Sequence, residues 1–125
     1  MFKINDDMSI HVTRGDAVRF KVTVEDNGQP YIFKQGEVLR INVFEKKACH
    51  SVVMQKDFHI EEEGPEVGIL LTGEDTRIGE VISKPSDYWY ELELNPDTEP
   101  FTVVGYDEDG AKVFRLYPEG DEGGN

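Results

Sequence analysis

The sequence predicts an all-β fold, an antiparallel β-sandwich of about seven to nine strands. Apolar and polar residues alternate with a period of two through most of the chain, so each strand can bury one face and expose the other. Turn-forming Gly, Pro and Asn residues separate the alternating segments, and almost no segment has helical periodicity. Segments with a single apolar face favour two stacked sheets over a barrel.

The expected strands follow from this alternation. The most regular is the segment 17–25, whose apolar face carries Val18, Phe20, Val22 and Val24. The other strands are expected at 9–13, 37–46, 52–60, 67–71, 88–94, 101–106 and 111–117. Residues 107–110 are expected to close a hairpin between the last two strands. The segment 73–80 is expected to form at most one helical turn.

Length and charge limit the class of protein. A chain of 125 residues suits one domain, which we expect over residues 1–118, with a flexible, acidic, Gly-rich tail at 119–125. The 13 basic and 26 acidic side chains give a net charge of −13, which disfavours nucleic acids and anionic membrane surfaces as partners. No apolar run is long enough to span a bilayer. The single cysteine, Cys49, is typical of a chain made in a reducing cytosol.

No pattern in the sequence predicts catalysis. The motif that presents a serine nucleophile on a strained turn is missing, and Cys49 and His50 are strand neighbours whose side chains point to opposite faces. The carboxylates at 61–63 and 74–75 suggest the acid pair of a glycoside hydrolase, but loop carboxylates are more often simply solvated. We therefore expect a protein that is not an enzyme.

Metal and cofactor patterns are equally weak. Residues 107–110 (DEDG) resemble part of a calcium loop but lack the later bidentate glutamate, so we interpret them as a turn. The three histidines, His11, His50 and His59, do not have the spacing of zinc ligands. We expect no metal and no cofactor.

Two surface features suggest binding. The tripeptide Arg14–Asp16 (RGD) matches a cell-adhesion motif, but a tight turn at Gly15 explains it without any receptor. Among the aromatic residues, Tyr88 and Tyr90 share the apolar face of their strand, whereas Trp89 points to the opposite face. Trp89 and Tyr106 are therefore the candidate interface residues, for a protein partner or for a sugar.

Five short segments follow one another in a characteristic order. They are Ile10–Asp16 (IHVTRGD), Gly36–Phe44 (GEVLRINVF), Leu71–Gly79 (LTGEDTRIG), Tyr88–Leu94 (YWYELEL) and Thr102–Gly110 (TVVGYDEDG). This order resembles the immunoglobulin-like (Ig-like) domains of phage and prophage tail and baseplate proteins. It is similar above all to N-terminal domains of the upper baseplate protein in phages of Gram-positive bacteria. The resemblance covers roughly residues 10–118 and implies an Ig-like form of the sandwich, with no catalytic residue carried over.

The resemblance also implies a function. We expect a non-enzymatic structural module of a phage or prophage tail, made in the bacterial cytoplasm and located in the virion. Its partners would be other tail or baseplate proteins and further copies of itself. The alternative is a carbohydrate-binding β-sandwich that stacks sugars on Trp89 or Tyr106.

Overall fold

The computed structural model describes residues 2–5, 7–26, 28–48, 50–104 and 110–119. Within these ranges it contains eleven strands and no helix, which confirms the all-β prediction. Three strands are very short: β1 (Phe2–Ile4), β4 (Glu25–Asp26) and β5 (Gln29–Pro30). The eight longer strands are β2 (Ile10–Thr13), β3 (Val18–Val22), β6 (Val38–Lys46), β7 (His50–His59), β8 (Val67–Leu71), β9 (Ser86–Leu94), β10 (Phe101–Val104) and β11 (Lys112–Tyr117).

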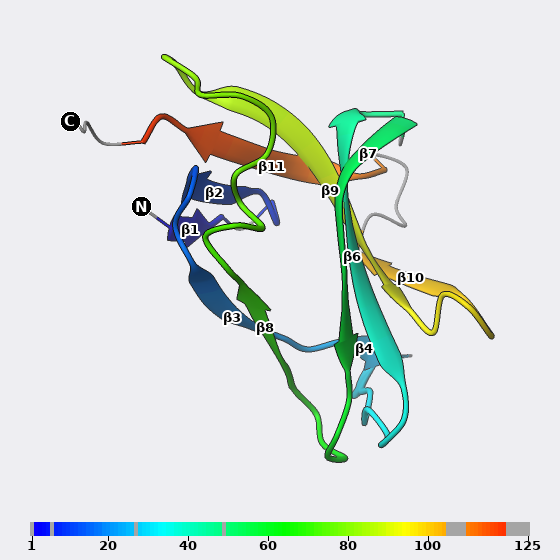
Figure 1. The fold of residues 1–125 in the computed structure, drawn as a ribbon. Helices are drawn as coiled ribbons and strands as arrows, with labels where there is room; N and C mark the ends of the chain where they lie inside the picture. The colour runs from blue at the N-terminus through cyan, green and yellow to red at the C-terminus, as the bar shows by residue number, and fades with distance from the viewer. Residues whose placement is uncertain (1, 6, 27, 49, 105–109, 120–125) are drawn as a thin grey trace.

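The strands form two main layers. A seven-stranded sheet has the order β1-β2-β11-β9-β6-β7, with β10 also beside β9, whereas the facing sheet consists of β3 and β8. Figure 1 shows β3 and β8 side by side, on one side of β6, β7 and β9. The core lies between the layers: it includes Ile41 and Leu92 from the large sheet and Ile69 from the small one, each at most 2% exposed. The two layers around one core make the fold a β-sandwich.

One pairing departs from the antiparallel prediction. All pairings of the described strands are antiparallel except that of β2 with β11, in which Ile10 lies opposite Phe114 in a parallel ladder. Parallel neighbours need a long connection, and here nearly the whole domain lies between the two strands. Such a pairing joins the two ends of the chain, so no local alternation pattern could indicate it.

The expected hairpin between the last two strands is wrong. Both β10 and β11 run antiparallel to β9, β10 beside Leu92–Leu94 and β11 beside Ser86–Tyr90. They therefore point in the same direction, one after the other along the same edge of β9. The hairpin is instead formed by β9 and β10 around Asn95, which has a positive φ of 51°. Residues 105–109 themselves lie outside the described part of the chain.

The burial of two phenylalanines differs from what the alternation predicts. Phe33 is completely buried although it lies outside the named strands, and its backbone bonds to Gly64. Phe20, expected on the buried face of its strand, is only partly buried and stacks against Phe2 with ring centroids 5.9 Å apart. The segment 73–80 forms a turn without a helix, in which the Thr76 N–H donates to the Thr72 carbonyl at 3.2 Å.

Candidate functional site

The outer face of the large sheet carries the first candidate site. Along β9 the side chains alternate: Tyr90 and Leu92 are buried in the core, whereas Trp89 and Glu91 point to the other side and are partly exposed. The structure thus places Trp89 on the face that the second sheet does not cover. Its orientation agrees with the sequence expectation, and its role as an interface residue stays a prediction.

Trp89 belongs to an apolar row that crosses four strands, which we call the Trp89 row. In the register of the large sheet, Trp89 lies between Phe44 on β6 and Val113 on β11, and Phe44 lies opposite Val52 on β7. Phe44 is only 5% exposed, yet it does not belong to the main core cluster. Val52, at the end of the row, is 52% exposed. Cross-strand neighbours of this kind touch one another, so the row is apolar across four strands, with Phe44 buried and Trp89, Val113 and Val52 partly or largely exposed.

A shallow depression of about 190 Å³ lies beside Trp89. It is lined by Trp89, Asp7, Ser9, Lys47, Ala111, Lys112 and Val113. Part of the indole is therefore accessible from outside, within a surface that also offers charged groups of both signs. The second candidate interface residue, Tyr106, lies outside the described residues.

Polar rows flank the Trp89 row on both sides. On one side the Arg115 guanidinium donates to Asp87 at 2.5 and 3.1 Å. On the other side the Asn42 amide donates to Glu91 at 3.2 Å and to Glu93 at 3.1 Å. Burial raises the pKa of the Glu91 carboxyl above its ordinary value, and the nearby charge of Glu93 acts in the same direction. This face therefore combines an apolar centre with a hydrogen-bonded, mostly acidic border.

An ion pair fixes the far edge of the same face. Arg40 on β6 donates two hydrogen bonds to Asp57 on β7, at 2.6 and 3.0 Å, and a third to Asp97 at 3.2 Å. The pKa of the Asp57 carboxyl lies below its ordinary value because Arg40 donates hydrogen bonds to this carboxylate. The bidentate geometry holds β6 and β7 in register beside the row.

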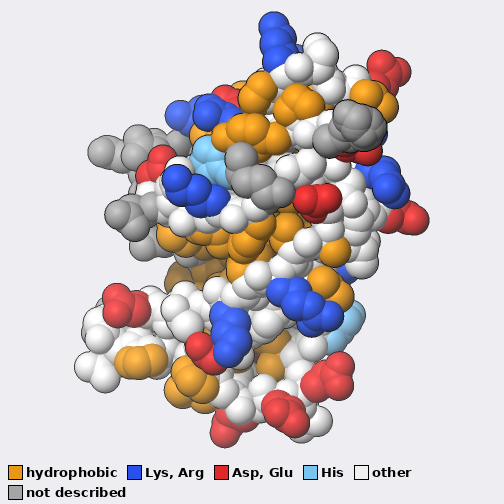
Figure 2. Space-filling model, turned by 90° about the vertical axis from the view of Figure 1, so that its left-hand side faces the viewer, with side chains coloured by type: hydrophobic (Ala, Val, Ile, Leu, Met, Phe, Trp, Pro, Cys, Tyr) orange, Lys and Arg blue, Asp and Glu red, His pale blue; other side chains and the backbone are white. Residues whose placement is uncertain are grey.

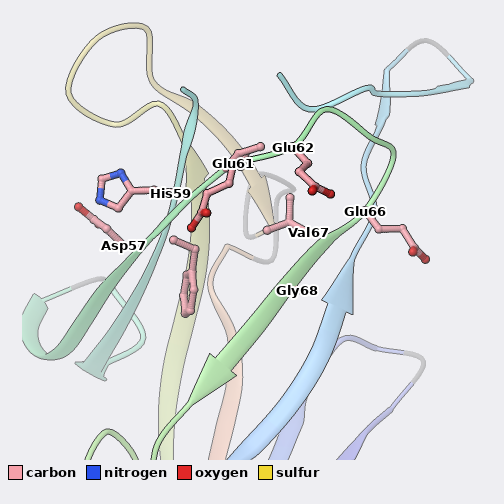
Figure 3. A pocket seen from close by; sticks show the side chains of 9 residues that line it. Asp57, His59, Glu61, Glu62, Glu66, Val67 and Gly68 are labelled. Carbon is pink, nitrogen blue, oxygen red and sulfur yellow. The ribbon is translucent and has the colours of Figure 1, made fainter. Parts of the chain in front are cut away.

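A larger depression, of about 540 Å³, lies between β7 and β8. Figure 3 shows the loop from Glu61 to Glu66 arching over it, with the Glu61 carboxylate directed into the space between the two strands. Phe58, Ile60 and Val67 contribute apolar surface to its walls. The carboxylates of 61–63, interpreted from the sequence as solvated, are exposed. They do not form a metal cluster: the described residues contain no group of three or more His, Cys, Asp or Glu side chains able to hold a metal ion.

The N-terminal hairpin contains a polar network that sequence reasoning missed. The Ser9 hydroxyl donates to Asp7 at 2.6 Å and lies 3.1 Å from Nε2 of His11, whose Nδ1 lies 2.8 Å from the Tyr117 hydroxyl. Asn5 approaches the same Nε2 at 3.0 Å. Ser9 is 5% exposed and its hydroxyl is bonded to the carboxylate, so the network joins β2 to β11 without presenting an activated nucleophile. Only the alternate spacing of Asp7, Ser9 and His11 could have indicated that their side chains meet.

Of the RGD tripeptide, Arg14 is buried, whereas Asp16 is exposed. The Arg14 side chain is 9% exposed and donates to the carbonyls of Ile78 and Gly79 at 3.1 and 2.7 Å. It also pairs with Glu119 at 2.6 Å, so the first residue of the expected tail is in contact with the domain; residues 120–125 lie outside the described part. An arginine used in this way is not presented to a receptor.

Figure 2 shows the side of the molecule that lies at the left of Figure 1. Lys and Arg side chains are interspersed there with Asp and Glu, and apolar side chains gather in a hollow across the middle. The described residues of this face therefore form no continuous basic surface of the kind that phosphate backbones require. Among the described residues, no helix is long and apolar enough to cross a membrane.

Comparison with known proteins finds no matching family model, no matching curated sequence and no matching solved structure.

Proposed function

We propose that the chain is a non-enzymatic assembly module of a phage or prophage tail, of the baseplate type, and that it associates through the Trp89 row. The single observation that carries the association is this row: an apolar strip across four strands, on a sheet face that the second layer leaves open. A central apolar strip with a polar border is how protein–protein interfaces are organised. Partners are other tail proteins and further copies of the chain, in the virion.

The strand order supports the Ig-like part of this proposal. The sequence β11-β9-β6-β7 in one sheet, opposite β3-β8 in the other, corresponds to strands G-F-C-C′ facing B-E of a variable-type Ig domain. The link to phage tails rests on the motif order quoted above, from Ile10–Asp16 to Thr102–Gly110.

The test is the removal of the indole. Trp89→Ala should weaken self-association or binding to tail proteins by at least 2 kcal/mol, about thirtyfold, because large aromatics at the centre of an interface carry much of its binding energy. Phe101→Ala is the matched control, since Phe101 is an aromatic residue on β10 that is 51% exposed and lies outside the row. Sedimentation measures self-association, and mass spectrometry identifies proteins captured from a phage-producing lysate.

Three outcomes count against the proposal. If Trp89→Ala unfolds the domain, Trp89 is a core residue and the surface assignment fails. If both variants associate as the parent does, the row is not the interface. If the parent is monomeric, captures no tail protein and binds glycans through Trp89, the protein is the carbohydrate-binding module of the alternative hypothesis.

A further inference from the structure

The two layers of the sandwich differ in width, and the difference leaves one strand edge open. The large sheet has seven strands, whereas within the described residues β8 pairs with β3 alone. The other edge of β8 borders the depression between β7 and β8 (Figure 3). An unpaired edge presents a row of backbone N–H and C=O groups, which another strand can pair with.

One hydrogen bond shows which residues of β8 direct their backbone groups toward the depression. Lys56, on β7, donates from Nζ to the carbonyl oxygen of Leu70 at 3.1 Å. In a β-strand the N–H and C=O of one residue point to the same side, and the side alternates along the chain. Within β8, Gly68 and Leu70 therefore direct these groups away from β3, whereas Val67, Ile69 and Leu71 direct theirs toward it.

Gly68 is the centre of this edge, and the fold does not require a glycine there. A Cβ built on Gly68 would meet nothing within 4 Å, and its φ is outside the left-handed region. Glycine inside a strand costs stability, and it often marks a place where a ligand or another backbone approaches closely.

The surroundings of the edge indicate what could bind. Phe58, Ile60 and Val67 offer apolar surface, and Glu61 and Glu62 also line the depression, with the Glu61 carboxylate directed into it (Figure 3). Glu66 adds a third carboxylate, 3.5 Å from the Nζ of Lys21 on the exposed surface. At the other end of β8, Lys56 donates to the Leu70 carbonyl and to Asp75 (2.6 Å), so a side chain already occupies the edge there. The open stretch therefore covers the first half of β8.

We propose that this edge binds one extended segment of a partner protein, which adds to β8 as the third strand of the small sheet. Backbone pairing with Gly68 supplies the geometry of the complex, and alternate side chains supply its specificity. The segment alternates apolar residues, which pack on Phe58 and Val67, with Lys or Arg, which face the carboxylates of Glu61 and Glu62. The overall charge of −13 adds long-range attraction for such a segment.

The probe is a fluorescent peptide of alternating lysine and valine, titrated by anisotropy against the full chain. Gly68→Pro removes an N–H that points into the depression but none that pairs with β3, so the sandwich should remain folded. It should weaken binding at least about tenfold. Gly68→Ala keeps the N–H and meets no neighbouring atom, so it should bind within about twofold of the parent.

Two modified peptides keep the test independent of the folding of any variant. The same peptide with alternate amides N-methylated should lose at least about tenfold in affinity, because its backbone cannot pair with the edge. A peptide of alternating glutamate and valine should not bind. The proposal is overturned if the parent does not bind the lysine peptide. It is also overturned if Gly68→Pro and the N-methylated peptide bind as well as their controls, since binding would then be electrostatic attraction without strand pairing.

Discussion

Gly73 lies so close to Gly15 that a Cβ on Gly73 would come within 2.5 Å of the Gly15 carbonyl oxygen. The contact joins the turn after β8 to the turn between β2 and β3. Thr76, which is completely buried, reinforces it: its hydroxyl accepts from the Gly15 N–H at 2.9 Å and donates to the Asp16 carbonyl at 2.8 Å. The RGD turn thus anchors one end of the sandwich.

We predict that Gly73→Ala destabilises the domain by about 1 to 3 kcal/mol, because the new methyl group must displace backbone. Gly64→Ala is the matched control, since a Cβ at Gly64 meets nothing within 4 Å. Urea denaturation of both variants measures the difference. Equal stability of the two variants would contradict the close approach.

The burial of the two phenylalanines leads to a second prediction. Phe114 is completely buried beside Tyr90, whereas Phe20 is only partly buried, at the edge of the core. Phe114→Ala should therefore cost about 3 to 5 kcal/mol, the range for a large core deletion, and Phe20→Ala clearly less. Thermal and urea unfolding compare the two. A larger cost for Phe20→Ala would mean that the small sheet is packed more tightly than the structure shows.

Strand positions and side-chain directions, which depend on neighbouring residues in the chain, could be predicted from the sequence. The alternation in β9 correctly assigned Tyr90 to the core and Trp89 to the opposite face, because the direction of side chains in a strand is set by a local period of two. The same reasoning placed the long strands within a few residues of their observed bounds.

Partners distant in the chain could not be predicted in this way. Both β10 and β11 pair with the edge of β9 that β6 does not occupy, a pairing between distant segments that the local pattern does not encode. The turn-like sequence at 107–110 suggested a hairpin instead. The Trp89 row could be predicted only in part for the same reason. The alternation showed that Trp89 points outward, but not that Phe44 and Val113 lie beside it. The open edge at Gly68 follows because β8 has β3 as its single strand neighbour within the described residues, which no local signal encodes.

Lys56 and Asp75 connect the large sheet to the end of β8, with Nζ 2.6 Å from Oδ2. Burial by itself would raise the pKa of the Asp75 carboxyl, but hydrogen bonds from Lys56 and Thr72 hold the pKa below its ordinary value of 3.8. We predict that Asp75→Asn costs about 1 to 2 kcal/mol at pH 7, since the bond to the charged lysine is lost.

The cost should depend on pH in a defined direction. The folded-state pKa of Asp75 is lowered. The contribution of this carboxylate to the free energy of unfolding is therefore fully present above about pH 4 and is lost as pH falls through the folded-state pKa. Urea denaturation of Asp75→Asn and the parent at pH 7 and at pH 2 should therefore show a difference that shrinks in acid. Lys56→Met and the double variant complete the cycle, and strictly additive costs would show that the two residues do not interact.

Glu91 should behave in the opposite way, because burial raises the pKa of its carboxyl above the ordinary value of 4.5. The folded state then binds the proton more tightly than the unfolded state, so the parent loses stability as pH rises from 4.5 through the folded-state pKa. Glu91→Gln removes the charge and keeps an oxygen that can accept from Asn42. We predict a higher melting temperature for Glu91→Gln than for the parent at pH 7, and no advantage at pH 4.

Glu99→Gln, at an exposed turn, is the control for the change in net charge. An equal gain in both variants would mean that relief of the overall charge of −13, and not the burial of Glu91, is responsible.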